Sequence, residues 1–212
     1  MRPWLPILVS LVLVSCEKDD TGMDYDILTG DLSFDDGAAV SVAGNKAFGF
    51  DRNGQALLYF AANPDATCDA VATYLDWGEP TDPSALFLAN HCNVYAMIND
   101  FTGDDVTITS DRTLVTWALN CTMGAGSWNW EVQGDDPGYY WSESYWQGDP
   151  ETWTITLSGG GGSDLVADIS MNDYDGDYIY EFVEATASGL VTGTALVEWC
   201  EDLGETPLFS SR

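Results

Sequence analysis

Apolar residues alternate with polar ones along much of this chain, and this period of two is the feature that most constrains its fold. The stretch 153–157 reads Trp-Thr-Ile-Thr-Leu, and the stretches 165–172 and 191–199 show the same alternation. Successive side chains of a β-strand point to opposite faces of a sheet, so this pattern predicts strands with one buried face. The chain is therefore expected to fold mainly as β-sheet.

Turn signals separate the predicted strands. The dipeptides Asn53-Gly54 and Asp175-Gly176 both favour tight hairpin turns, because their residues tolerate positive φ angles. We therefore predict a β-hairpin at each site. The strands that these turns would join are 47–52 and 55–61 for the first, and 165–171 and 178–183 for the second.

One short helix is predicted, beginning near Asn63-Pro64. Asn is a favoured cap and Pro fits the first helical position. Apolar residues follow at helical spacing through Leu75, and Gly78 ends the pattern. Together with the strands, this predicts an all-β fold, an antiparallel sandwich or barrel of roughly 8–11 strands with one short helix.

The chain is strongly acidic. It has 35 Asp and Glu residues against six Lys and Arg, and its formal net charge is −29. This excludes nucleic acid as a partner, because phosphate binding needs clustered positive side chains. Hydrophobic residues make up 45% of the chain, which is too many for a disordered acidic tail, so we expect a folded domain with an acidic surface.

The first sixteen residues resemble the signal peptide of a bacterial lipoprotein. Arg2 precedes the apolar run 5–13, whose nine residues are fewer than the roughly 20 that a spanning helix needs. The run ends in Leu13-Val14-Ser15-Cys16, which resembles a lipobox. The resemblance implies that Cys16 becomes the first mature residue and carries acyl chains such as palmitate. The alternative is an ordinary secretory signal in which Cys16 is incidental.

Three segments are therefore expected: a signal peptide at 1–15, a lipidated acidic tether at 16–24 and a single all-β domain at 25–212. In lipoproteins of this kind, Asp after the lipidated Cys is associated with retention in the inner membrane. Here that position is Glu17. We expect a cell-envelope protein that contacts the membrane through its anchor, in the outer membrane rather than the inner one.

Four cysteines remain beyond the anchor, namely Cys68, Cys92, Cys121 and Cys200. An even number in an exported chain predicts two disulfide bonds. Three pairings are possible, and we prefer Cys68–Cys92 with Cys121–Cys200, which closes one short and one long loop. No Cys-x-x-C motif is present, so the cysteines indicate neither a redox motif nor a zinc knuckle.

The acidic segment 172–177 is a candidate calcium site. Asp173, Asp175 and Asp177 alternate there, and Ca²⁺ is bound by six to eight oxygens. An EF-hand template aligned on the glycine of this segment meets apolar residues at its first and last ligand positions. We prefer the interpretation that this is a hairpin turn with solvated carboxylates, and no other cofactor is expected.

An aromatic cluster spans 128–153, where eight Trp and Tyr residues are interleaved with acidic ones. Flat aromatic faces stack on sugar rings, and carboxylates accept hydrogen bonds from sugar hydroxyls, so the cluster is a candidate carbohydrate site. The residues favoured for ligand contact lie in a turn-rich stretch: Tyr140, Trp141, Tyr145 and Trp146. The interpretation that we prefer places Trp128, Trp130 and Trp153 in the core.

Motifs of common enzyme classes are absent from the sequence. Its single histidine, His91, excludes sites with two histidine ligands, and there is no Gly-x-Ser-x-Gly or P-loop motif. Glycoside hydrolysis needs two carboxylates roughly 5–10 Å apart, a spacing that so acidic a chain satisfies by chance. We expect a non-enzymatic envelope module that binds carbohydrate or an envelope protein, or is structural. The alternative is a carbohydrate-binding or carbohydrate-hydrolysing domain that uses the 128–153 cluster.

Overall fold

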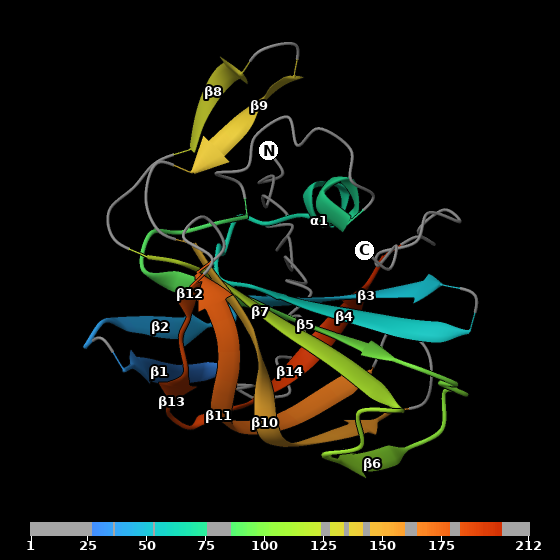
Figure 1. Cartoon of the computed structure of the whole chain (residues 1–212). Coiled ribbons are helices and arrows are strands. Elements are labelled where there is room, and N and C mark those ends of the chain that lie inside the picture. The colour runs from blue at the N-terminus through green and yellow to red at the C-terminus, as the bar shows by residue number, and fades with distance from the viewer. Residues whose placement is uncertain are drawn as a thin grey trace, which may run out of the picture.

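The computed structural model describes residues 27–35, 37–52, 54–75, 86–123, 128–133, 136–141, 145–159, 165–178 and 183–200. These residues form strands and a single helix, α1 (Figure 1). In chain order the elements are β1 (Thr29–Phe34), β2 (Ala39–Ala43), β3 (Lys46–Arg52), β4 (Gln55–Ala61), α1 (Cys68–Leu75), β5 (His91–Ile98), β6 (Val106–Thr109), β7 (Val115–Thr122), β8 (Trp128–Gln133), β9 (Asp136–Trp141), β10 (Tyr145–Ser158), β11 (Val166–Tyr178), β12 (Val183–Glu184), β13 (Ala187–Ser188) and β14 (Val191–Trp199).

Nine of the described strands close into a barrel. Hydrogen-bonded neighbours run from β11 through β13, β1, β14, β3, β4, β5 and β7 to β10, and β10 pairs with β11 to close the ring. Most pairings are antiparallel, whereas β14 meets β3 and β2 meets β5 in parallel. The predicted all-β barrel or sandwich with one short helix is confirmed.

Strand β4 shows how the barrel is stabilised on both sides. Ala56, Leu58 and Phe60 face the barrel interior, and each is at most 1% exposed. Leu57 and Tyr59 point the other way and are equally buried. Fully burying one large apolar side chain contributes roughly 1.5–3 kcal/mol, so a strand buried on both faces contributes more than the half-buried strands that the sequence pattern predicts.

Helix α1 makes this second burial possible. It lies over the outer face of the wall formed by β3, β4, β5 and β7 (Figure 1), and its Val71 and Leu75 are buried there with Phe48 and Tyr59. On the other side of the barrel, β14 also pairs directly with β11. No described element covers the wall formed by β6, β10, β11 and β14, whose outward residues are exposed or half-buried. The two walls of the barrel therefore differ: the outer face of one is largely buried, and the outer face of the other is open to solvent.

The helix begins later than the sequence predicts. Thr67 caps it, because the Thr67 hydroxyl accepts a hydrogen bond from the Ala70 amide at 3.3 Å. Asn63 instead closes a turn before the helix, where its side-chain oxygen accepts from the Asp65 amide at 2.9 Å. The predicted start at Asn63-Pro64 is therefore wrong by one turn, and Gly78, its predicted end, lies outside the described residues.

The first predicted hairpin is confirmed. Strands β3 and β4 pair antiparallel, with Arg52 opposite Gln55 at the tip, and Gly54 has a φ of 83°. Such a positive φ is the conformation that a glycine at a tight turn provides. Asn53 itself lies outside the described residues.

The second predicted hairpin is wrong. Asp175 and Gly176 lie inside β11, which continues through them to Tyr178. Gly176 is directly opposite Gly148 of β10, and a Cβ at Gly176 would lie 2.3 Å from the carbonyl oxygen of Gln147. This glycine permits a close approach between two strands, and not a turn.

Strands β10 and β11 bend together near Asp173, whose φ is 53°. Up to Met171 the odd-numbered residues of β11 face the core, and from Tyr174 onward the even-numbered residues do. On β10, Pro150 and Trp153 are buried on either side of the same bend. When the alternation of a strand shifts by one residue, every following side chain moves to the opposite face. Here the alternation shifts in both strands at the bend, so apolar residues face the barrel interior on either side of it.

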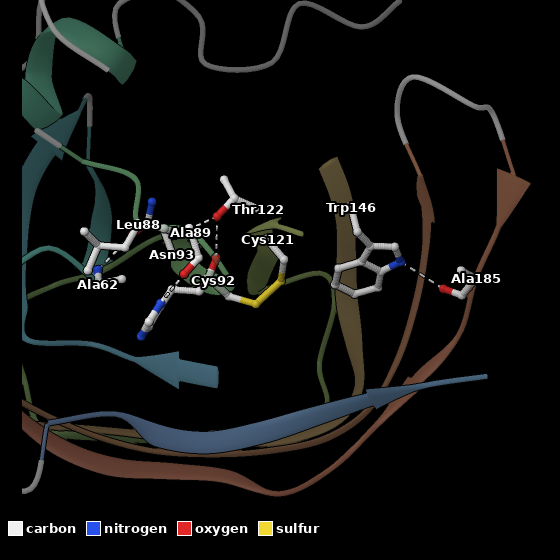
Figure 2. The surroundings of a disulfide bond; sticks show 10 residues. Ala62, Leu88, Ala89, Cys92, Asn93, Cys121, Thr122, Trp146 and Ala185 are labelled. Atoms are coloured by element: carbon white, nitrogen blue, oxygen red, sulfur yellow. Dashed lines mark hydrogen bonds between the residues drawn. A yellow bond between two sulfur atoms is a disulfide. The ribbon is translucent and has the colours of Figure 1, made fainter. Parts of the chain in front are cut away.

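Two disulfide bonds are present, as predicted, but the preferred pairing is wrong. Cys92 of β5 is bonded to Cys121, directly opposite on β7, with their Cα atoms 4.0 Å apart (Figure 2). Cys68, the first residue of α1, is bonded to Cys200, which follows β14. The register of β5 and β7 places Cys92 beside Cys121, so Cys68 and Cys200 pair with each other. The spacing of cysteines in the sequence does not reveal this register.

Candidate functional site

The aromatic cluster at 128–153 divides between the barrel core and a separate hairpin. Trp146 and Trp153 lie on β10 and belong to the core. The stretches 128–133 and 136–141 form β8 and β9, a two-stranded sheet that pairs with no described strand of the barrel. Figure 1 shows this hairpin clear of the barrel, on the side where α1 lies.

Trp146 is a core residue and not a ligand contact. Its side chain is 0% exposed, its ring packs edge-on against Phe34 at 5.1 Å, and its Nε1 donates to the carbonyl of Ala185 at 2.9 Å (Figure 2). The prediction that Trp146 contacts a ligand is therefore wrong, because β10 has strand partners on both sides and turns this side chain into the barrel. Trp153 packs against Trp117 at 5.5 Å, so its predicted place in the core is confirmed.

The register of the β8–β9 hairpin gathers aromatic positions on one face. Trp128 is directly opposite Trp141, and Trp130 is directly opposite Tyr139. Directly opposite residues of an antiparallel pair share a face, and residues two apart along a strand share one too. These four positions therefore lie on the same face of the hairpin, which we call the aromatic face.

The opposite face of the hairpin carries mostly polar residue types. Asn129 is opposite Tyr140 there, and Gln133 is opposite Asp136. Trp141 and Tyr140, both predicted as ligand contacts, are adjacent in β9 and so lie on opposite faces. Tyr145, the remaining predicted contact, is outside the hairpin, at the start of β10.

Three members of the aromatic face were not among the residues predicted to contact a ligand. Trp128 and Trp130 were expected in the core, and Tyr139 was not singled out. The signal was present in the alternation Trp-Asn-Trp at 128–130 followed by Tyr-Tyr-Trp at 139–141. Without the register, however, that alternation does not show which residues of the two strands share a face.

The predicted calcium ligands lie along one strand and do not converge. Asp173, Asp175 and Asp177 all belong to β11, and no three His, Cys, Asp or Glu residues of the described chain are grouped so that they could hold a metal ion. Asp175 is opposite Asp149 of β10. Because Asp175 and Asp177 are exposed and Asp149 is half-buried, they form an acidic strip on the outside of the barrel beyond the bend.

One carboxyl of the acidic strip has a shifted pKa. Partial burial of Asp149 raises its pKa, and the Arg112 guanidinium, 3.0 Å from its carboxylate, opposes the rise. Arg112 also lies 3.0 Å from the Glu151 carboxylate and donates to the Pro150 carbonyl. Both carboxylates are thus engaged by one cation, which ties the turn before β7 to the bend of β10. Exposed ion pairs of this kind contribute about 0–1 kcal/mol.

A shallow pocket of about 280 Å³ lies between β3 and β14, close to residue 27. Ala47, Ala195 and Leu196 give it largely apolar walls. Lys46 also lines it, but its ammonium donates to the Ala66 carbonyl at 2.8 Å. The pocket therefore offers mainly apolar contact to a small ligand.

The lipobox and Cys16 lie outside the described residues. In the part of the chain that the structure describes, no helix has both the length and the apolar character needed to cross a bilayer.

Comparisons of the chain with protein-family models, with curated proteins and with solved structures find no match. Function is therefore inferred from the residues of the chain and their placement. The feature that most directly indicates an interaction is the aromatic face of the β8–β9 hairpin.

Proposed function

We propose that this chain is an exported, lipid-anchored, non-enzymatic binding module of the cell envelope, and that the β8–β9 hairpin is its binding element. One observation supports this most directly. The register of β8 and β9 places Trp128, Trp130, Tyr139 and Trp141 on a single face of a two-stranded sheet that no described barrel strand pairs with. Tyr and Trp are enriched at binding interfaces.

The resemblance of residues 13–16 to a lipobox supports the anchor. Ile27, the first described residue, follows Cys16 by eleven positions, and at roughly 3.6 Å per extended residue this distance is at most about 40 Å. A tether of that reach lets a domain with a net charge near −29 stand more than a Debye length of about 8 Å from anionic headgroups. The favoured location is the outer membrane, because Glu17 follows the lipidated cysteine.

Metabolic labelling tests the anchor. Cells that express the full chain are grown with radiolabelled palmitate, alongside cells that express Cys16→Ser. Label in the wild-type protein and none in Cys16→Ser is the expected result. Equal labelling of both proteins, or of neither, contradicts the anchor.

Carbohydrate is the ligand class that the hairpin favours over an envelope protein. The C–H groups of a sugar ring pack well on a flat aromatic surface, and the aromatic face offers several such positions in two adjacent rows. Acidic residues also occur along the 128–153 stretch, and carboxylates accept hydrogen bonds from sugar hydroxyls. A glycan array probed with the full-length protein is expected to give bound spots, and an array that stays blank contradicts this assignment.

A further inference from the structure

The wall of the barrel that α1 leaves uncovered carries a regular array of short hydroxyl side chains on its outer face. One row crosses the four strands β6, β10, β11 and β14, with each residue directly opposite the next. Its members are Thr107, Thr156, Asp168 and Thr194. Hydrogen bonds along the row join Thr107 to Thr156 at 3.0 Å and Thr194 to Asp168 at 3.4 Å.

A second row runs beside the first, two residues along each strand. Its members are Thr109, Thr154, Ser170 and Thr192. The hydroxyls of Thr109 and Thr154 lie 3.2 Å apart. We call the two rows together the hydroxyl face. Neighbouring positions are about 4.8 Å apart across strands and about 6.8 Å apart along them, so the face presents a repeating lattice of hydroxyl and methyl groups.

Along the outer faces of β10 and β11, more carboxylates lie beyond the bend than before it. Before the bend, the hydroxyl face holds one carboxylate, that of Asp168, and no cation. Beyond the bend, the outward positions of the same two strands include Asp149, Asp175 and Asp177. An anionic ligand would be repelled by this border, and a cationic one would be drawn to the carboxylates in preference to the hydroxyls. The hydroxyl face is therefore complementary to an uncharged ligand.

We propose that the hydroxyl face is a second binding site, and that its ligand is a neutral, extended polysaccharide. Each bonded pair of threonines keeps one free donor and three acceptor positions, which sugar hydroxyls can fill. Threonine has few rotamers, and the bonds along the rows restrict them further, so little side-chain entropy is lost on binding. This site does not depend on the hairpin proposal.

The shape of the wall favours one flexible chain over a flat crystalline surface. Adjacent strands of a sheet rotate by roughly 20–25° relative to each other, so a rigid plane could touch only part of an array four strands wide. A single polysaccharide strand can follow the twist and sum many weak hydrogen bonds along its length. A monosaccharide would gain too few of these bonds to be held.

Affinity electrophoresis of the full-length protein in detergent tests the site. Native gels are cast with dextran, hydroxyethyl cellulose or galactomannan as neutral polymers, and with alginate as an anionic one. The wild-type protein is expected to be retarded by at least one neutral polymer and not by alginate. In the variant Thr154→Val with Thr156→Val, which removes hydroxyls at nearly constant shape, the retardation is expected to fall at least fivefold.

A control variant shows whether the effect requires the loss of hydroxyls from the hydroxyl face or also follows the loss of a threonine hydroxyl elsewhere on the barrel. Thr116 is an exposed strand threonine on the other wall, and Thr116→Val is expected to be retarded like the wild type. Melting temperatures of all variants confirm that they are folded. The inference is overturned if no neutral polymer retards the wild type, or if Thr154→Val with Thr156→Val is retarded equally. It is also overturned if a hairpin substitution, Trp130→Ser, abolishes retardation by itself, because the binding would then belong to the hairpin.

Discussion

The indole ring of Trp146 occupies the space that a side chain at Gly176 would need. A Cβ at Gly176 would lie 2.7 Å from Cζ2 of Trp146, and a Cβ at Gly148, directly opposite, would lie 2.3 Å from its Cη2. The two glycines thus leave room on facing strands for the Trp146 indole, which is fully buried in the barrel interior. The Asp175-Gly176 dipeptide is explained by this packing, without a turn.

This relationship predicts the cost of adding one methyl group. Gly148→Ala is expected to lower the free energy of unfolding by about 1–3 kcal/mol, because overpacking forces side chains or backbone to move. Denaturant unfolding followed by tryptophan fluorescence measures the change. Combining it with Trp146→Leu tests the cause, since the smaller side chain should make Gly148→Ala less costly. Equal costs in both backgrounds would show that Trp146 is not the obstacle.

The two disulfides should differ in their resistance to reduction. Cys92 and Cys121 are both 0% exposed, whereas Cys68 is half-buried at the start of α1. Mild dithiol treatment of the native protein, followed by alkylation and mass spectrometry, is expected to label Cys68 and Cys200 first. Removing this bond with Cys68→Ser and Cys200→Ser should cost about 2–5 kcal/mol of stability. Earlier labelling of Cys92 or Cys121 would contradict the structure.

The hydroxyl group of Tyr59 should lower the stability of the protein. The residue is 0% exposed, and among the described residues its hydroxyl has no hydrogen-bond partner. Tyr59→Phe is therefore expected to raise the free energy of unfolding by about 1 kcal/mol, since an unsatisfied buried polar group is removed. A variant less stable than the wild type would contradict this.

The same substitution has a pH signature. Burial raises the pKa of Tyr59 well above its ordinary value, so the folded state keeps a proton that an unfolded tyrosine releases near pH 10. Stability should fall as the pH rises above about 10. The fall should be shallower in Tyr59→Phe, as unfolding curves recorded between pH 8 and 11 would show.

Asp149 and Asp111 should change the stability of the protein in opposite directions as the pH rises through the acidic range. Partial burial raises the pKa of Asp149, so its ionisation is harder in the folded state and the wild type should lose stability relative to Asp149→Asn as the pH rises through the acidic range. Hydrogen bonds from Thr113 lower the pKa of Asp111, so the wild type should gain relative to Asp111→Asn over the same range. Melting temperatures between pH 3 and 7 measure both differences, and parallel trends in the two variants would contradict the assignment.

Local patterns predicted the strands well and their connections less well. The alternation along β11 up to Met171 and the turn at Gly54 depend on nearest neighbours in sequence, and both were found where expected. The predicted start of α1 was wrong because Asn63 accepts a hydrogen bond within a preceding turn and Thr67 caps the helix instead. Both residue types can cap a helix, so residue type alone does not decide between them. A strand buried on both faces, like β4, also needs the tertiary position of α1.

The candidate site could be predicted only in outline. The 128–153 cluster was evident in the sequence, but its division between the core and a hairpin depends on register. Trp146 and Trp141 are only five residues apart, and one lies inside the barrel while the other lies on a separate sheet. Pairing over long range decided this, just as it decided the partner of Cys92.

The central claim is that the aromatic face of the β8–β9 hairpin binds the ligand, and adjacent residues of β9 test it most directly. Trp141 belongs to the aromatic face and Tyr140 to the opposite one. Full-length wild type, Trp141→Ser and Tyr140→Ser are compared quantitatively on one glycan array. We expect Trp141→Ser to lose about tenfold or more in apparent affinity, the equivalent of roughly 1.4 kcal/mol, and Tyr140→Ser to stay within about twofold of the wild type. Equal losses in the two variants, or unchanged binding by Trp141→Ser, would contradict the claim.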